Sequence, residues 1–226
     1  MLSDHYDHFG LLSDGPFNMQ LLATRGYAVL LPDSPQHEAT PLADLAKTVL
    51  PGVNKVIEIG VADPDRLGVF GQSNGGYSTL GLIVQTKRFK AAVDLDGVGD
   101  LVGHYGQMST DGASFGISLE HGQDAMGGTV WALRQRYIEN SPFFYLDRVE
   151  TPVLIVHGAK DSVVAPFLGD EVFVGLRRLG KEAVYAKYVN EEHSPLYWSY
   201  QNQTDLCNRL LAWFDKYLKQ SAPLEK

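Results

Sequence analysis

The stretch Gly71-Gln72-Ser73-Asn74-Gly75-Gly76 constrains the fold more than any other part of the sequence. It follows a strand-like run at 66–70 and leads into a helix-like run from Tyr77. A serine in such a sharp turn has a strained backbone, so its neighbours must be nearly free of side chain. The five-letter pattern Gly-x-Ser-x-Gly alone arises by chance in roughly one chain in ten of this length. Together with its strand–turn–helix context, the pattern predicts that the Ser73 hydroxyl is exposed at the carboxyl end of a sheet.

Apolar, strand-like runs alternate with helical patterns along the chain, which is typical of a mostly parallel sheet with helices on both faces. We expect one α/β domain over residues 1–226, in which about 97–141 form an insertion or lid-like segment, since a connection this long is usually functional. Strands are expected at 27–31, 66–70, 91–95, 152–156 and 183–189. Helices are expected at 17–25, 41–50, 53–61, 73–85, 167–179 and 195–218, with Pro51-Gly52 breaking the second from the third.

Two later strands end in residues that a nucleophilic serine requires. The run at 152–156 leads to Asp161, and the run at 183–189 leads to His193. Alone, Asp161 would be a turn former and His193 a surface residue, but the chain order Ser, Asp, His is that of α/β-hydrolases. In that arrangement His193 accepts the Ser73 proton, while Asp161 fixes the histidine tautomer. Glu191 and Glu192 are the alternative carboxylates.

The sequence from about Gln20 to Leu218 resembles the catalytic domain of the prolyl oligopeptidase family of serine hydrolases. The similar stretches occur in family order, with Asp161 88 positions after Ser73 (161 − 73) and His193 32 positions further on (193 − 161). They are 20–29, 63–69 with the serine turn, 137–142 and 157–161. The resemblance implies an α/β-hydrolase fold, Ser73, Asp161 and His193 as catalytic residues, and the Asn74 amide as an oxyanion donor. It implies no metal or organic cofactor.

The amino terminus departs from the family pattern. Family members have a strand ahead of the helix at Gln20, and the sequence shows no run resembling it, nor a β-propeller. We therefore expect an amino-terminally truncated sheet. The strand would lie between 27–31 and 66–70, and a gap in the middle of a sheet leaves backbone groups unsatisfied. Either those two strands pair directly, or another chain closes the gap, and we expect a homo-oligomer.

Val163 is a second departure, since peptidases of the family often have Arg or Asn there to bind a substrate carbonyl. Valine cannot donate such a hydrogen bond. We therefore expect a serine esterase that acts on small or medium acyl groups through an acyl-enzyme. The alternative is a serine peptidase, either an exopeptidase or of the acylaminoacyl type. A further alternative is a catalytically impaired hydrolase fold that serves as a binding protein.

The segment after Leu95 supplies aromatic residues for a substrate pocket beside Ser73. We expect Tyr105, Phe115 and Trp131 to line it, together with Val163 and Val164. His104, Met108 and Met126 are further candidates from the segment. The alternative is that these aromatic residues only pack the segment against the domain.

Composition excludes several other classes. A net charge of −8 without a Lys/Arg cluster argues against nucleic-acid and anionic-membrane partners. No apolar run is long enough to span a bilayer, and the acidic amino terminus is unlike a signal peptide, so we expect a cytoplasmic protein. Cys207 is the single cysteine and excludes an intramolecular disulfide. His5 and His8 have no third partner marked for a metal.

Overall fold

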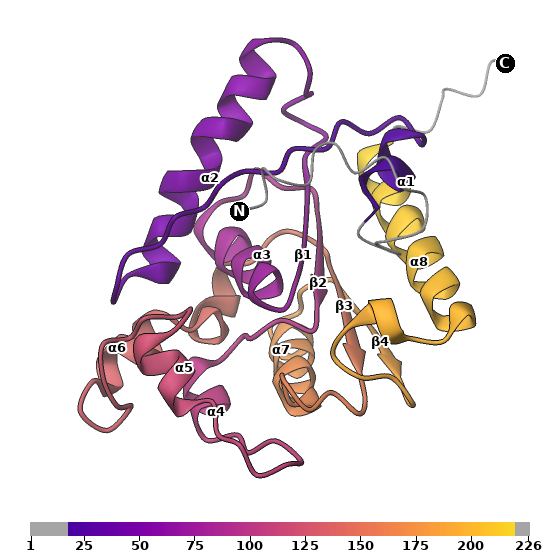
Figure 1. Ribbon diagram of the computed structural model, residues 1–226. Coiled ribbons are helices and arrows are strands. Elements are labelled where there is room, and N and C mark those ends of the chain that lie inside the picture. Colours follow the sequence, from indigo (N-terminus) through magenta and orange to yellow (C-terminus); the bar gives the residue numbers. More distant parts are fainter. Residues whose placement is uncertain (1–17, 220–226) are drawn as a thin grey trace, which may run out of the picture.

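The core of the computed structural model, which describes residues 18–219, is a sheet of four parallel strands. Its strands are hydrogen-bonded in chain order, and the register aligns Gly71 with Asp94, and Asp94 with Ile155. All four strands therefore have their carboxyl ends at one edge of the sheet (Figure 1). The strands are β1 (Gly68–Gln72), β2 (Ala91–Leu95), β3 (Val153–Gly158) and β4 (Ala183–Tyr188).

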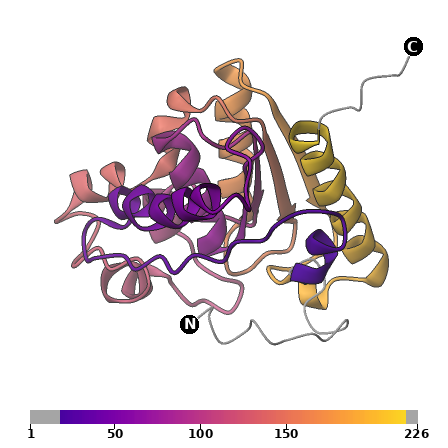
Figure 2. The ribbon, with the colours of Figure 1, turned by 90° about the horizontal axis from the view of Figure 1, so that it is seen from above.

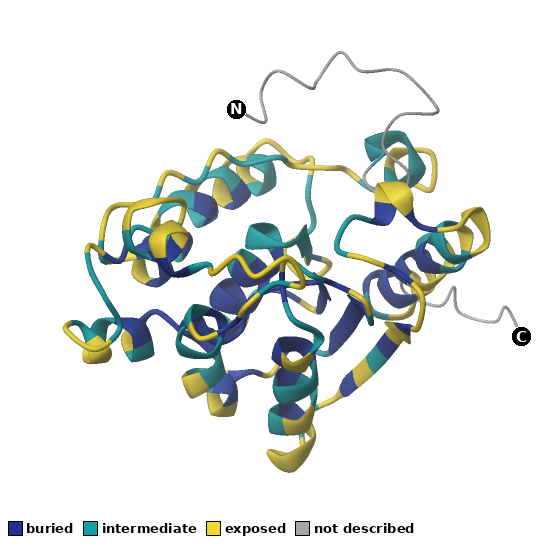
Figure 3. Ribbon diagram, turned by 60° about the horizontal axis from the view of Figure 1, so that its bottom comes forward, coloured by how far each residue is buried: buried dark blue, intermediate teal, exposed yellow. Residues whose placement is uncertain are grey.

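Helices cover both faces of the sheet, as the alternating sequence pattern predicts (Figures 1 and 2). One face carries α2 (Pro41–Glu58), α3 (Asn74–Gln85) and α7 (Pro166–Arg178), and the other carries α8 (Tyr200–Leu218) and the short α1 (Met19–Ala23). Each face has its own apolar core. The central strands β2 and β3 are wholly buried, whereas β4 alternates between buried and exposed residues at the edge (Figure 3).

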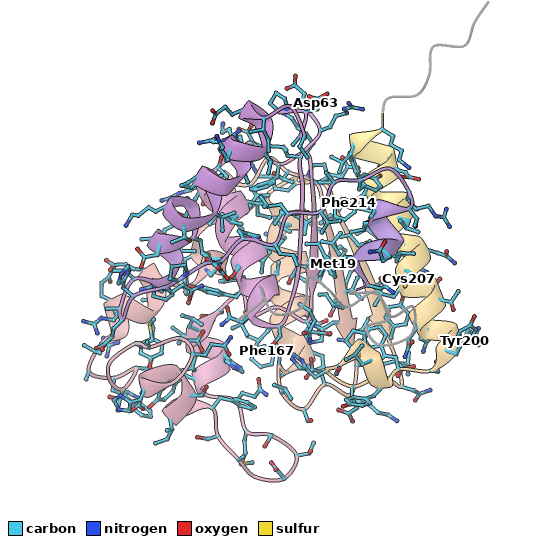
Figure 4. The ribbon with its side chains drawn as sticks, turned by 45° about the horizontal axis from the view of Figure 1, so that its top comes forward. Met19, Asp63, Phe167, Tyr200, Cys207 and Phe214 are labelled. Atoms are coloured by element: carbon cyan, nitrogen blue, oxygen red, sulfur yellow. The ribbon has the colours of Figure 1, made fainter. Side chains whose placement is uncertain are left out.

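The α8 helix packs one side against the sheet and exposes the other. Phe214 lies so close to β1 that a Cβ added at Gly68 would be 2.8 Å from its ring. Tyr200, at the beginning of α8, points away from the sheet and is exposed, and Cys207 is half-buried on the same helix (Figure 4).

Short helices build the segment that the sequence predicts as an insertion. They are α4 (Leu101–Tyr105), α5 (Gly116–His121) and α6 (Arg134–Glu139), and the 3₁₀ helix η3 (Pro142–Arg148) follows directly after the segment. In Figure 1 the α-helices among them gather beside α3, near the carboxyl ends of the strands. A second 3₁₀ helix, η4 (Pro195–Tyr197), precedes α8.

Two of the expected elements are wrong. Residues 27–31 are not a strand, and the four-stranded sheet ends at β1 in the part of the chain that the structure describes. The segment instead passes from the side of α1 to the side of α2 (Figures 1 and 2), with Val29 and Leu30 exposed. A β-branched, apolar run becomes a strand only where a neighbouring strand accepts it. Direct pairing of 27–31 with β1 is therefore not how the sheet is completed, and the expected homo-oligomer stays a prediction.

The second error concerns α2, which runs unbroken through Pro51. Leu45, Val49 and Val53 are buried on one side of this helix, while Pro51 and Lys47 are on its exposed side. The carbonyl that loses its hydrogen bond to the proline therefore faces solvent, and packing of the apolar stripe continues the helix. Within residues 18–219, none of the helices combines the length and apolar character needed to cross a membrane.

Candidate active site

Ser73 lies in the turn between β1 and α3 with backbone angles of φ 58° and ψ −118°. This strained conformation is tolerated because the turn is packed around glycines. A Cβ at Gly71 would be 2.1 Å from the Gly75 carbonyl oxygen, and one at Gly76 would be 2.5 Å from both Asp94 and Gly97. The turn is the nucleophile elbow that the sequence predicts.

Asp161 and His193 are hydrogen-bonded to one another at the same sheet edge. The His193 Nδ1 atom is 2.7 Å from Oδ2 of Asp161. The other carboxylate oxygen, Oδ1, accepts hydrogen bonds of 2.8 Å from the backbone N–H groups of Val163 and Val164. Asp161 is thus fixed from both sides, and His193 carries its proton on Nδ1 when it is neutral.

A second imidazole supports the same carboxylate. His157, wholly buried at the end of β3, has Nε2 2.9 Å from the Val164 carbonyl and 3.3 Å from Oδ2 of Asp161. Burial raises the pKa of Asp161, but its contacts with His157 and His193 outweigh that and lower it to about 2. Asp161 is therefore a carboxylate at neutral pH. Sequence reasoning used the His-Gly pair only as part of a resemblance and missed this contact.

His157 itself lies between two acids. Burial lowers its pKa, but the hydrogen bond with Asp161 and the charge of Asp96 outweigh burial and raise the pKa above its usual value. Asp96 accepts a hydrogen bond of 2.9 Å from the Gly158 amide, and burial raises its pKa to about 7.

The catalytic nitrogen of His193 faces Gln72 and not Ser73 in this structure. The Gln72 side-chain amide nitrogen is 3.2 Å from His193 Nε2 and donates a 3.1 Å hydrogen bond to the His193 carbonyl. With Nδ1 protonated, Nε2 is a free acceptor, so it accepts this amide N–H. Transfer of a proton from Ser73 requires the Gln72 amide to give way.

The amino terminus of α3 lies directly behind Ser73. Asn74 is the first helical residue, and the first N–H groups of a helix have no partner inside it. The Asn74 amide is therefore available to an oxyanion, as the sequence predicts.

A pocket of about 120 Å³ opens beside Ser73. Three of the five residues predicted for it line it, namely Phe115, Val163 and Val164. His104, a further candidate from the same segment, lines it too. The lining also includes residues that sequence reasoning did not assign to it: Asn74, Tyr77, Val98, Ser118, Gln123 and Asp124. Polar residues of an irregular segment carry no periodic signal, so only the fold could assign them.

Tyr105 and Trp131, also predicted for the pocket, are not among its lining residues. Their rings pack edge to face at a centroid distance of 5.5 Å, and the Tyr105 hydroxyl donates a 2.7 Å hydrogen bond to Glu120. Trp131 is 74% exposed. These two aromatic residues hold the short helices together, as the alternative interpretation has it.

The profile of the prolyl oligopeptidase family matches residues 44–221, which is most of the chain. This chain belongs to the prolyl oligopeptidase family. The matched range contains Ser73, Asp161 and His193, each on a loop after its own strand.

Comparison with individual proteins agrees with this assignment. The chain is 31% identical over 157 residues (69% of this chain) to a Bacillus subtilis protein named "uncharacterized peptidase YuxL", and 30% identical over 176 residues (76% of this chain) to the acylamino-acid-releasing enzyme of Arabidopsis thaliana. The acylaminoacyl peptidase of Pyrococcus horikoshii superimposes with a TM-score of 0.67 over 81% of this chain at 24% identity, which shows a shared α/β-hydrolase fold. The chain spans 23%, 22% and 29% of these three proteins, so it corresponds to a part of them.

One group of buried side chains in this family member could converge on a metal ion. The ligand atoms of Asp96, His157 and Asp161 lie within 4.8 Å of one another. Both oxygens of Asp161 and Oδ1 of Asp96 accept hydrogen bonds from protein groups, whereas Asp96 Oδ2 and His157 Nδ1 have no hydrogen-bond partner among the described residues. His5 and His8, the other candidates from the sequence, lie outside the described residues.

Glu191, one alternative to Asp161, has a structural role. Its Oε1 accepts hydrogen bonds from Ser199 and Asn202 at the beginning of α8. Glu191 thereby fixes the loop that carries His193.

Proposed function

We propose that this protein is a serine peptidase that cleaves short peptides or acylated peptides through an acyl-enzyme. The observation that carries the proposal is the strained Ser73 beside an Asp161–His193 pair joined at 2.7 Å, at one edge of the sheet. Membership of the prolyl oligopeptidase family supports amide hydrolysis, and the names of the similar proteins favour a peptidase over the ester hydrolase expected from Val163.

In the proposed reaction, the Gln72 side-chain amide, which is 3.2 Å from His193 Nε2 in the structure, first moves away from that nitrogen. Ser73 Oγ attacks the carbonyl carbon while His193 Nε2 takes the Ser73 proton, and Asp161 stabilises the imidazolium. The Asn74 amide donates to the oxygen that becomes negative, a type of contact worth about 10²–10³ in kcat. His193 then gives the proton to the leaving nitrogen as the carbon–nitrogen bond breaks. Water, activated by His193, releases the acyl group.

Ester hydrolysis is a second candidate, and Val163 favours it. Its backbone N–H is used by Asp161, and its side chain, 39% exposed, offers no donor to a second substrate carbonyl. A substrate with a better leaving group depends less on such a contact.

A fluorophosphonate probe tests the shared chemistry, and matched substrates separate the two candidates. We expect the probe to label wild-type protein and not Ser73→Ala. Comparing kcat/KM for an N-acetyl-alanine p-nitroanilide and the corresponding p-nitrophenyl ester, in wild type and Val163→Arg, ranks amide against ester. We expect Val163→Arg to improve peptide substrates. Absence of labelling would favour the non-catalytic binding protein and overturn the proposal.

A further inference from the structure

Asp124 places a carboxyl group in the lining of the pocket that contains Ser73. Asp124 follows α5, and it lines the pocket together with Ser118 and Gln123. Its charge acts on the hydroxyl groups of Tyr77 and Tyr137, both almost wholly buried, so the carboxyl group faces the interior. No lysine or arginine is among the lining residues in the described part of the chain.

The polar groups around Asp124 are engaged elsewhere. The Tyr77 hydroxyl donates to the Asn140 carbonyl at 2.9 Å, and the Tyr137 hydroxyl donates to the Gly128 carbonyl at 2.9 Å. Between residues 18 and 219, burial is the one influence on the Asp124 carboxyl, with neither a hydrogen bond nor an ion pair to offset it.

The backbone around Asp124 is held in place. Ala125 has a positive φ of 44°, and its carbonyl accepts a 2.8 Å hydrogen bond from the Ala39 amide. The next residue, Met126, donates to the Leu119 carbonyl at 2.8 Å. A strained, non-glycine residue persists only where its surroundings over-determine it, so the position of Asp124 beside the pocket is fixed.

Asp124 is half-buried in the pocket wall, and a carboxylate without a partner there carries a desolvation cost that a cation would offset. Burial raises the pKa of Asp124 to about 6, so the group is still mostly ionised at pH 7. The protein supplies no cation here, and the pocket is open to substrate.

The pocket receives the acyl side of the substrate. A leaving group must lie beside His193, because His193 protonates it, and His193 is not among the pocket's lining residues. Ser73 and Asn74, which meet the carbonyl carbon and oxygen, do line it. A volume of about 120 Å³, less than the roughly 150 Å³ of a cavity that takes up benzene, suits one side chain or an amine end.

We propose that Asp124 selects substrates with a positive charge on the acyl side of the scissile bond, either a lysine or arginine side chain or a free α-ammonium group. This inference rests on the proposed serine hydrolase function. Asp124 binds the cation, while Phe115, Val163 and Val164 contact the apolar part of the same group.

Two substrate pairs test the charge and identify its source. The first pair is N-acetyl-arginine and N-acetyl-citrulline p-nitroanilide, which differ in side-chain charge. The second is alanine and N-acetyl-alanine p-nitroanilide, which differ in the α-ammonium group. Wild type, Asp124→Asn and the control Glu139→Gln are compared, since Glu139 is an exposed acid of the same segment outside the pocket.

In Asp124→Asn we expect the cationic-to-neutral ratio of kcat/KM to fall about 30-fold or more in one pair, the lower limit for removing one member of a buried charge pair. Neutral substrates change less than about threefold, and Glu139→Gln keeps the wild-type ratios. The pair that loses its preference identifies the source of the charge.

Unchanged ratios in an Asp124→Asn protein that the fluorophosphonate probe still labels would overturn the cation site alone. Absence of labelling and of turnover in wild type would overturn the proposed function, and this inference with it. If Asp124→Asn does not fold, protection of wild-type Ser73 from the probe decides the question. Butylammonium should protect at a concentration at least about tenfold lower than butanol, and equal protection would overturn the inference.

Discussion

The sheet edge that carries Ser73, Asp161 and His193 differs in construction from the segment over 96–141 that forms the pocket wall. At the sheet edge, backbone hydrogen bonds tie the loops to one another. The Ser73 amide donates to Leu95 at 2.9 Å, the Ala159 amide to Tyr188 at 2.8 Å, and the Lys160 amide to Glu191 at 2.9 Å. These bonds bring the loops that carry Ser73, Asp161 and His193 to one edge of the sheet, where Asp161 and His193 are 2.7 Å apart.

The wall is held by side-chain hydrogen bonds in addition to backbone ones, such as that from the Ala39 amide to the Ala125 carbonyl. Gln107 donates to the Val163 carbonyl at 3.0 Å and accepts from the Ala165 amide at 2.8 Å, while Arg136 donates to the Met126 carbonyl at 2.6 Å. Substitutions in this segment can change the residues that line the pocket without displacing the sheet. The difference implies a division of labour, in which the sheet edge determines the reaction and the wall determines the substrate.

Substitution of the nucleophile at the sheet edge should have the largest effect. Ser73→Ala is expected to lower kcat by on the order of 10⁶-fold, as loss of a catalytic serine does in other hydrolases, and to abolish labelling. The fold should persist, because alanine is smaller than serine in the same turn. Active-site titration with far-UV circular dichroism as the folding control measures both. Activity above about a hundredth of wild type would remove Ser73 from the proposed role.

Asp161→Asn comes next, with an expected loss on the order of 10⁴-fold, because the amide would stabilise the wrong tautomer of His193. Glu191→Gln is the matched control. Its Oε1 bonds only support the His193 loop, so its kcat should fall far less. Steady-state kinetics on one neutral anilide compare the two, and a larger loss in Glu191→Gln would transfer the acidic role to Glu191.

The sequence predicted the sheet edge far better than the wall. The reason is that the signals for the sheet edge lie close in sequence to the residues that they predict. Gly71 is required by its contact with nearby Gly75, although Gly76 is required by contacts with Asp94 and Gly97. Asp161 and His193 each follow a run whose strand character is local. Asp124 has no such strand-end signal, and the residue next to it, Ala125, is held by a hydrogen bond from Ala39, which is 86 positions earlier (125 − 39).

The same distinction explains the errors. Residues 27–31 have strand-like side chains, but a strand also needs a neighbour, which the sequence of the segment cannot supply. Pro51 breaks a helix by local rules, whereas Leu45, Val49 and Val53 bury a continuous stripe across it. Tyr105 and Trp131 are aromatic in the expected segment, but the fold turns them toward one another.

Substitution of His157 tests whether a residue besides Ser73, Asp161 and His193 contributes to the reaction at the sheet edge. His157→Phe removes the 3.3 Å contact of Nε2 with the Asp161 carboxylate and the 2.9 Å hydrogen bond to the Val164 carbonyl. Because a hydrogen bond to a charged group is worth about 1.5–3 kcal/mol, kcat should fall by about 10- to 100-fold with little change in KM. His157→Gln, which retains a donor, should restore part of that loss. A change confined to KM, or equal effects of both variants, would limit His157 to packing.

The pH dependence of substrate choice tests the wall by itself. Asp124, whose pKa burial raises to about 6, is mostly ionised at pH 7.5 and mostly protonated at pH 5. The preference for a cationic over a neutral substrate should therefore fall by roughly tenfold between those pH values. Burial lowers the pKa of His104 in the same pocket, which favours its neutral form. Both substrates use Ser73 and His193, so their ratio cancels changes at the sheet edge. A ratio that is flat with pH would contradict a charged role for Asp124.

The smallest effect is expected at Asp94, which joins the two regions. Its Oδ1 lies against Gly76 at the beginning of α3 and against Gly97 at the beginning of the wall. Burial raises the pKa of Asp94 to about 7 from an ordinary value of 3.8. The folded protein thus holds a proton that the unfolded chain releases, and stability is lost as the pH rises from about 4 to about 7. Asp94→Asn removes that loss, so it should raise the melting temperature at pH 8 by more than at pH 5.

The difference between the two pH values should be a few degrees, since about 1 kcal/mol shifts the melting temperature of a domain of this size by roughly 2–4 °C. Differential scanning calorimetry at both pH values, with Asp65→Asn as an exposed control, measures it. An equal shift at both pH values would mean that Asp94 is ionised in the folded protein. Some group at the junction of α3 and the wall would then have to pair with its charge, and the two regions would be coupled through that pair.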